Sequence, residues 1–284
     1  MIKLKNLELT GAENKPITLD LFYEEKQQQP LVIYAHGFNG FKDWGNFDLI
    51  AEQFVNRGMA FLKFNFSHNG TSPADPENFV DLEAFGNNNY SKELYDLGKV
   101  IDWIADPQNE YNNSLDIDNI FLLGHSMGGG IVLLKTAEES RVKAVTTWAS
   151  IGECKTPWGS WSEERIKDWK LKGVDYSINS RTKQQMPLYF QLYEDYQQNK
   201  ERLNIVEAVK KINVPILLCH GTADEAVPYT TAELLQQQNE NAEILLLDSD
   251  HVFGRKHPWA DTTLPAAMQK VVDVTIAFFK KQVK

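Results

Sequence analysis

One pentapeptide, Gly124-His125-Ser126-Met127-Gly128, constrains the fold of this 284-residue chain more than any other feature. The apolar run Asn119–Leu123 before it is typical of a short buried strand, and Ile131–Lys135 behind it opens a helical pattern. A G-x-S-x-G sequence between a strand and a helix predicts a sharp turn that lifts the serine hydroxyl above the edge of a sheet. The small flanking residues let strand and helix approach without a Cβ clash. An ordinary glycine-rich turn is the alternative, and the surrounding sequence has to decide between the two.

Strand-like and helix-like segments alternate along most of the chain. Apolar or alternating runs predict further strands at Ile2–Leu9, Ile17–Tyr23, Leu31–Ala35, Ala60–Phe66, Val142–Ala149, Val214–His220 and Ile244–Leu247. Helical periodicity predicts helices at Asn46–Arg57, Tyr90–Ala105, Tyr229–Gln238 and Pro265–Lys280. This order predicts an α/β fold with a mostly parallel, doubly wound sheet and antiparallel N-terminal strands.

A long segment interrupts the alternation between two of these strands. We therefore divide the chain into a core, residues 1–150 and 213–284, and an inserted lid (cap), residues 151–212. The insertion is rich in aromatic residues at partly helical spacing, which predicts a helical lid over the carboxyl edge of the sheet. Trp158 and Trp161 are its candidate substrate-binding residues. The alternative is that most of these aromatic side chains only fix the insertion to the core.

Charge and cysteine content exclude several classes of protein. The formal net charge of −10 and the absence of a basic patch argue against binding to nucleic acid or to an anionic membrane. No apolar run approaches the length of a membrane span, and the N-terminus lacks the pattern of a signal peptide. Cys154 and Cys219 give no disulfide framework. We therefore expect a cytoplasmic protein, and the sequence leaves a homodimer open.

Three polar residues follow three separate predicted strands. A serine hydroxyl needs a histidine base that is held by a carboxylate, and in a sheet of this type the chain order is Ser, Asp or Glu, then His. Ser126 follows the first of the three strands, Asp224 follows Val214–Cys219, and His251 follows Ile244–Leu247. We predict that Ser126 is a nucleophile, His251 its general base and Asp224 the acid that orients the base.

Other residues compete for these roles. Glu225 is an alternative acid, and His220 and His257 are alternative bases. His125 is expected to pack within the turn rather than to take part in chemistry. Two further acids lie too close in sequence to His251 and are expected to cap its turn, Asp248 and Asp250.

Acyl transfer also needs N–H donors for the negatively charged oxygen of the tetrahedral intermediate. Met127, directly after the serine, offers one at a helix start, where backbone N–H groups are unpaired. The loop His36–Gly40 follows the strand Leu31–Ala35, and we predict the Phe38 N–H as the second donor. A tight turn without a chemical role is the alternative for this loop. Phe41 and Trp44, close behind it, are candidate contacts for an apolar or aryl acyl group.

From about Leu31 to the C-terminus the chain resembles the α/β-hydrolase superfamily. The resemblance rests on segments that follow four strands: His36-Gly37-Phe38, Gly124-His125-Ser126-Met127-Gly128-Gly129, His220-Gly221-Thr222-Ala223-Asp224 with Val227-Pro228, and Asp250-His251. Within the superfamily the chain is most similar to the dienelactone-hydrolase and prolyl-oligopeptidase-like group and to bacterial cinnamoyl or feruloyl esterases. The resemblance implies the roles given above for Ser126, Asp224, His251, Phe38 and Met127. Dienelactone hydrolases proper use a cysteine where this chain has Ser126, which argues against that reaction.

These observations lead us to expect a serine carboxylesterase that hydrolyses small-molecule esters of small or aromatic carboxylic acids through an acyl-enzyme. We expect no cofactor and no metal, because the sequence has no cluster with metal-ligand spacing. A prolyl-oligopeptidase-like peptidase is a rival, although no propeller-like repeat precedes the domain. A thioesterase or acyltransferase would need the same residues. A non-catalytic binding module is the rival from a different class.

Overall fold

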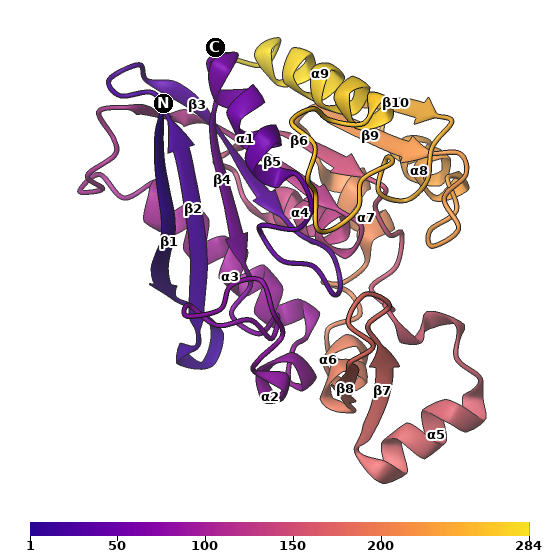
Figure 1. Ribbon diagram of the computed structural model, residues 1–284. Helices are drawn as coiled ribbons and strands as arrows, with labels where there is room; N and C mark the ends of the chain where they lie inside the picture. The colour runs from indigo at the N-terminus through magenta and orange to yellow at the C-terminus, as the bar shows by residue number, and fades with distance from the viewer. Residues whose placement is uncertain (284) are drawn as a thin grey trace.

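An eight-stranded sheet runs through the centre of the molecule (Figure 1), and the computed structural model describes residues 1–283. Its strands lie in the order β1-β2-β4-β3-β5-β6-β9-β10. Their bounds are β1 Ile2–Thr10, β2 Pro16–Tyr23, β3 Gln29–Ala35, β4 Ala60–Asn65, β5 Leu115–His125, β6 Val142–Trp148, β9 Ile216–Gly221 and β10 Ala242–Leu247. β1 and β2 pair antiparallel, as do β2 and β4, whereas all later neighbours are parallel. The predicted fold class is confirmed.

Helices cover both faces of this sheet because its strands alternate apolar side chains between two cores. In β3, Val32 and Tyr34 face a core closed by α1 (Phe47–Asn56) and α9 (Ala266–Lys280). Leu31, Ile33 and Ala35 of the same strand face the opposite core. The helices of that second layer are α3 Tyr90–Ile104, α4 Met127–Glu138, α7 Ile205–Lys211 and α8 Thr230–Gln236. Burial on both faces explains why these strands read as continuous apolar runs in the sequence.

The insertion forms a lobe at one end of the sheet, below the core in Figure 1. It contains the short 3₁₀ helix η2 (Trp158–Ser160), α5 (Glu163–Lys172), an antiparallel hairpin of β7 (Val174–Ile178) and β8 (Gln185–Tyr189), and α6 (Gln191–Gln198). The insertion thus contains helices, as predicted, together with a hairpin that the sequence analysis did not predict. The hairpin exists because β8 buries Met186 and Leu188 in the main core cluster, a long-range contact that the local pattern of the strand does not reveal.

The insertion does not separate cleanly from the core at its end. α7 lies within residues 151–212, yet Ile205 packs so closely on α4 that a Cβ added to Gly130 would lie 2.8 Å from its Cδ1. The remaining short elements are η1 (Ala12–Asn14), before β2, and α2 (Leu82–Gly86), which packs against β8. Among residues 1–283, no helix combines the length and the hydropathy needed to cross a bilayer. The division into core and lid stays a prediction.

Candidate active site

Ser126 lies at the point where β5 ends and α4 begins, in a strained backbone conformation. Its φ of 55° and ψ of −119° are rare for a residue with a side chain and cost on the order of 1–3 kcal/mol. The neighbouring glycines make the turn sterically feasible. A Cβ at Gly124 would lie 2.2 Å from the Gly128 carbonyl oxygen, and one at Gly128 would lie 2.4 Å from the oxygens of Ala35 and His36. The fold therefore holds Ser126 in a backbone conformation that a serine rarely adopts.

Asp224 lies in the loop after β9 and holds His251, in the loop after β10, through a short hydrogen bond. The His251 Nδ1–H donates to Asp224 Oδ2 over 2.7 Å, and the Asp224 side chain is fully buried. The backbone N–H groups of Ala226 and Val227 donate to Oδ1, both over 2.8 Å. Burial raises the pKa of Asp224, but its hydrogen bonds from His220, His251 and Val227 outweigh burial and hold this pKa well below its ordinary range. A permanently ionised carboxylate thus orients the imidazole.

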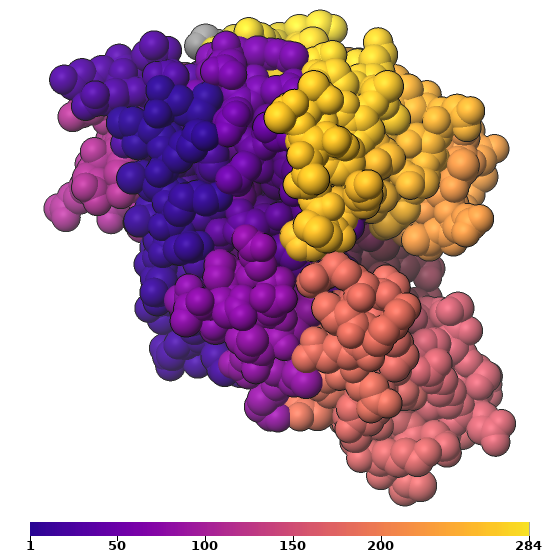
Figure 2. Space-filling model, in the orientation of Figure 1, coloured from indigo at the N-terminus to yellow at the C-terminus, as the bar shows by residue number. Residues whose placement is uncertain are grey.

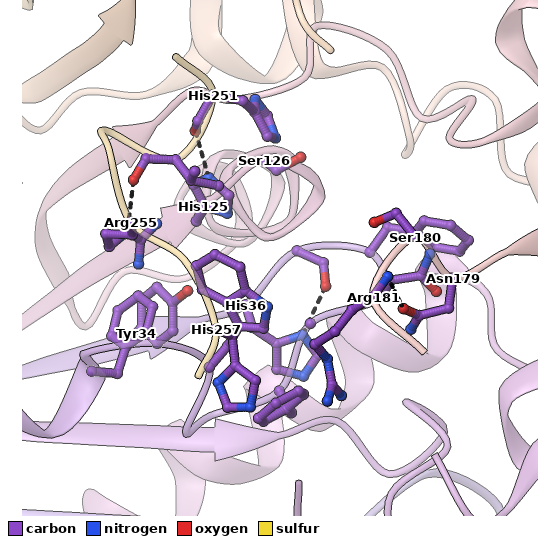
Figure 3. A pocket seen from close by; sticks show the side chains of 18 residues that line it. Tyr34, His36, His125, Ser126, Asn179, Ser180, Arg181, His251, Arg255 and His257 are labelled. Carbon is purple, nitrogen blue, oxygen red and sulfur yellow. Dashed lines mark hydrogen bonds between the residues drawn. The ribbon is translucent and has the colours of Figure 1, made fainter. Parts of the chain in front are cut away.

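Ser126 and His251 line the same cavity, whose volume is about 320 Å³. Figure 3 shows the His251 imidazole beside Ser126 at one end of this cavity. Within residues 1–283, the Ser126 hydroxyl makes no hydrogen bond and is open to the cavity. His125 holds the backbone of His251, since its Nε2–H donates to the His251 carbonyl oxygen over 3.0 Å. This neighbour of the serine therefore positions the loop that carries His251, in addition to the packing role predicted for it.

The loop after β3 lies directly against this turn. A Cβ added to Gly37 would lie 2.9 Å from the Ser126 Cβ, so the loop and the serine are in contact. The backbone N–H groups of Phe38 and Met127 have no hydrogen-bond partner in the described chain. His36 braces the loop from within, where its Nδ1–H donates to the Gly37 carbonyl over 2.9 Å and burial lowers its pKa to about 4. The two N–H groups predicted as oxyanion donors are therefore free and are carried by loops that touch.

The four predicted substrate-binding residues fall into two groups. Phe41 and Trp44 line the cavity of Ser126. Trp158 and Trp161 do not, because they line a separate groove on the insertion. Trp158 packs edge-on against Tyr193 with ring centroids 4.9 Å apart, and Trp161 packs against the fully buried Trp169 at 5.2 Å. The ring partners of both tryptophans thus lie within the insertion, outside the lining of the Ser126 cavity.

The insertion contacts the cavity through residues that sequence reasoning did not single out. Asn179, Ser180 and Arg181 lie in the turn between β7 and β8, and this turn forms part of the cavity wall. In Figure 2 the surface of the insertion meets the yellow C-terminal segment, which brings Arg255 and His257 to the same cavity. The signal that the sequence offers for Arg255 is its position four residues after His251.

The competing residues occupy positions with other roles. The His220 Nε2–H lies 3.1 Å from Asp224 Oδ2 and 3.0 Å from the Val227 carbonyl, so it supports the carboxylate from the buried side. His257 Nδ1 accepts from the Gly45 N–H over 2.8 Å. Glu225 is exposed, and Asp250 Oδ1 accepts from the Gly254 N–H over 2.7 Å, which caps the turn as expected. In this structure His251 alone among the candidate bases lines the serine cavity and is held by Asp224.

One cluster of carboxylates has ligand spacing for a metal ion, but lysines occupy it. Asp20, Asp43 and Asp48 offer oxygens within 4.8 Å of one another. Lys42 Nζ lies 2.8 Å from Asp20 Oδ1, and Lys63 Nζ lies 2.6 Å from Asp48 Oδ1. Ammonium groups already neutralise the charge that would attract a cation, so this cluster is a network of ion pairs.

Residues 19–238 match the BD-FAE family, an α/β-hydrolase esterase domain. The chain belongs to the BD-FAE family. The match includes the turn of Ser126 and reaches past Asp224, whereas His251 lies beyond its end. Membership makes the protein a hydrolase of the esterase kind. The contact between Asp224 and His251 connects the matched region to the segment outside it.

Curated relatives agree with this class at low identity. The chain is 31% identical over 119 residues to the quorum-quenching protein AidA of Acinetobacter baumannii, but spans only 34% of that protein's length. Human mitochondrial palmitoyl-protein thioesterase ABHD10 is 24% identical, with 88% of this chain and 76% of that protein covered. A Mycoplasma genitalium protein, named provisionally as an esterase or lipase, is also 24% identical, with coverage of 88% and 91%.

Solved structures show the same fold over almost the whole chain. Est1E from Butyrivibrio proteoclasticus, determined with bound ferulic acid, has a TM-score of 0.67 at 19% identity and covers 97% of this chain and 98% of its own. The esterase domain of a Rhodothermus marinus protein has a TM-score of 0.66 at 18% identity, with full coverage of both chains. At such identities the likeness establishes the fold alone.

Proposed function

We propose that this protein is a serine carboxylesterase that hydrolyses esters of small or aromatic carboxylic acids through an acyl-enzyme intermediate. One observation carries the proposal. Ser126, on a strained turn, shares a cavity with an imidazole that an ionised, buried Asp224 holds at 2.7 Å, beside two unpaired backbone N–H groups. Nucleophile, base and oxyanion donors are the groups that acyl transfer requires.

Each group has a defined part in the reaction. Ser126 Oγ attacks the ester carbonyl and transfers its proton to His251 Nε2, because Nδ1–H is engaged by Asp224. The Phe38 and Met127 N–H groups stabilise the oxyanion, and the second lies at the N-terminus of α4, where the helix dipole favours negative charge. The imidazolium then protonates the leaving alcohol. A water molecule, activated by the same imidazole, releases the acid from Ser126.

The size and lining of the cavity support short or single-ring acids. Its volume of about 320 Å³ lies at the lower end of the range for small-molecule sites. Phe41 and Trp44 supply aromatic walls, and Phe38 lies beside the turn. Ring stacking and apolar burial against these walls would favour an aryl or short acyl group over a long chain.

A panel of p-nitrophenyl esters from acetate to palmitate, with proline p-nitroanilide alongside, tests the proposal. We expect the highest kcat/KM for acetate to butyrate, with rates that fall for long chains and negligible release from the anilide. A peptidase would release the anilide faster than the esters. Hydrolysis of no substrate in the panel would contradict the esterase proposal and favour a binding module.

Thioester hydrolysis is a second candidate, because the human thioesterase ABHD10 aligns with 88% of this chain. The same triad would serve a thioester. Butyryl-CoA and palmitoyl-CoA, assayed beside p-nitrophenyl butyrate, separate the two activities. A kcat/KM for either thioester well above that for the oxygen ester would replace the carboxylesterase proposal.

A further inference from the structure

The cavity around Ser126 has a charge balance opposite to that of the whole chain. The chain carries a formal net charge of −10. Yet the residues that line the cavity include Arg181, Arg255 and four histidines, and no aspartate or glutamate. Neither arginine forms an ion pair with any residue among 1–283. A lining of this kind attracts negative charge.

Arg255 is the more unusual of the two arginines, because it is buried and forms no ion pair with the described residues. It is 4% exposed, and its Nε donates to the Val252 carbonyl over 2.8 Å. Neither Nη1 nor Nη2 has a hydrogen-bond partner within the described residues. Burial lowers the pKa of Arg255, whereas the neighbouring Tyr34 hydroxyl and, less strongly, the charge of Asp250 raise it. Burying a cation that forms no ion pair is unfavourable for the fold.

Aromatic rings contact the guanidinium but do not satisfy its donors. The Arg255 Cζ lies 4.8 Å from the ring centroid of Phe47 and 5.5 Å from that of Trp44. Cation–π contacts use the flat faces of the group and stabilise its charge. The N–H donors lie in the plane of the group, at its edge, and two parallel donors there match the oxygens of a carboxylate.

Further donors lie on the way into the cavity. Because the Gly45 N–H donates to His257 Nδ1, the neutral imidazole carries its proton on Nε2, which is a further donor. Arg181 lies on the turn between β7 and β8, with its guanidinium 5.7 Å from the ring centroid of Phe41. Figure 3 shows His257 between the two arginines. The cavity thus offers cationic or N–H groups from the mouth to the buried end.

We propose that the substrate carries a free carboxylate in addition to its scissile ester, and that Arg255 binds this carboxylate inside the cavity. A single buried guanidinium matches one negative charge, and its planar edge matches a carboxylate. The exposed Arg181 attracts the anion at the mouth. This inference rests on the proposed esterase function and names the class of ester that the enzyme selects.

Pairs of esters that differ only in charge test the proposal. Methyl 4-carboxybenzoate and methyl 4-carbamoylbenzoate place the charge on the acyl side, whereas 4-acetoxybenzoate and 4-acetoxybenzamide place it on the leaving group. After correction for the spontaneous rates, we expect kcat/KM of the carboxylate to exceed that of its amide by about tenfold or more in at least one pair, as charge-assisted hydrogen bonds allow.

Two failures are distinguishable in this experiment. If the amides are hydrolysed as fast as the carboxylates, or faster, the inference is wrong and the esterase function stands. If neither these esters nor p-nitrophenyl acetate are hydrolysed, the esterase function itself is wrong.

Variants then assign the preference to one residue. We expect Arg255→Met to bring the carboxylate-to-amide ratio close to one, and Arg255→Lys to lower it severalfold because the paired donors are lost. Lys256→Gln is the matched control, since it removes the adjacent exposed cation, which does not line the cavity, and should leave the ratio unchanged. Each ratio is measured within one protein preparation, so a smaller folded fraction cancels. An unchanged ratio in Arg255→Met contradicts the assignment.

A binding measurement gives a readout without turnover. In Ser126→Ala protein, calorimetric titration with 4-acetoxybenzoate should give a Kd at least about tenfold lower than titration with 4-acetoxybenzamide. In the double variant Ser126→Ala/Arg255→Met the two Kd values should be similar. Equal Kd values for the two probes in Ser126→Ala itself would overturn the proposal.

Discussion

Positive charge is buried in a lysine cluster beside β2 and β4 and also at the cavity of Ser126, and these two regions treat it in opposite ways. Beside β2 and β4, Lys42 and Lys63 are fully buried and both contact Asp20, which is also fully buried. At the cavity of Ser126, Arg255 is almost as deeply buried, but its Nη donors have no partner in the described chain. The paired region stabilises the fold, whereas the unpaired one is available for a ligand. The difference teaches that a buried charge indicates function when its partner is missing.

Glu93, a buried carboxyl group, shows how an unpaired buried acid loses its charge. An arginine has no such route. Glu93 on α3 is 4% exposed; in the described structure the Asn88 amide donates to its Oε1, and its Oε2 has no hydrogen-bond partner. Burial raises the pKa of Glu93 to about 8. The carboxyl group thus becomes neutral by taking up a proton. A guanidinium stays charged at every physiological pH, so Arg255 needs an anion instead.

The comparison predicts loss of activity without loss of stability in the cavity, and the reverse in the paired region. The largest effect is expected for Ser126→Ala. Its kcat/KM should fall by about 10⁴-fold or more, since the nucleophile is removed. The Ser126 hydroxyl has no hydrogen bond to lose, so the free energy of unfolding should change by less than about 0.5 kcal/mol. Steady-state kinetics and urea unfolding measure both, and retained turnover would place the reaction elsewhere.

Asp224→Asn should lower kcat by about 10³- to 10⁴-fold, because an amide no longer fixes the tautomer and charge of His251. Glu225→Gln is the matched control, one residue away and exposed, and should stay within about twofold of the unchanged protein. If the two variants exchanged these effects, Glu225 would be the acid of the triad.

Asp20→Asn tests the paired region. It leaves Lys42 and Lys63 with one carboxylate fewer, and we expect a loss of at least about 3 kcal/mol in the free energy of unfolding. The turnover of the folded fraction should stay within about tenfold, measured at low temperature. Asp102→Asn, which removes an exposed pair with Arg141 (2.7 Å), should cost less than about 1 kcal/mol. Equal costs for the two variants would remove the contrast between buried and exposed pairs.

Glu93→Gln should change how stability depends on pH. Between an ordinary pKa of 4.5 and the folded value of about 8, the folded protein holds a proton that the unfolded chain has lost, so stability falls as the pH rises through this range. Glutamine keeps the acceptor for Asn88 and removes this penalty. We expect the variant to gain at least about 1 kcal/mol at pH 8 and to match the unchanged protein near pH 4. Thermal unfolding at both pH values checks this, and parallel curves would contradict it.

Only a small change in stability is expected for Arg255→Met. Loss of an unpaired buried charge offsets loss of the aromatic contacts, so the free energy of unfolding should change by less than about 1 kcal/mol. A loss as large as that of Asp20→Asn would mean that Arg255 is held by the fold as firmly as the buried lysines. Urea unfolding of both variants under one condition decides between these outcomes.

Most strands of the sheet and most helices could be predicted, because each shows the hydrophobic periodicity of its own secondary structure. α4 starts at Met127, as expected for the residue after the serine, although its helical periodicity becomes visible only from Ile131. The hairpin of β7 and β8 was missed, because its stability depends on Met186 and Leu188 reaching the main core. Trp158 and Trp161, predicted as substrate-binding residues, line a separate groove and not the Ser126 cavity. The spacing of these tryptophans indicates burial, but it does not identify the residues against which they pack.

By itself, the sequence determined the strand-to-helix turn at Ser126, since only glycine fits at positions 124 and 128. It also determined the order in which Asp224 and His251 follow later strands. Both are local properties, written in neighbouring residues. The tertiary structure alone decided that the turn of a hairpin, and not the tryptophans of the insertion, lines the cavity, and that Arg255 lies there without an ion pair to the described residues. Whether a buried charge has a partner depends on every segment that packs around it, and a local sequence pattern does not identify those segments.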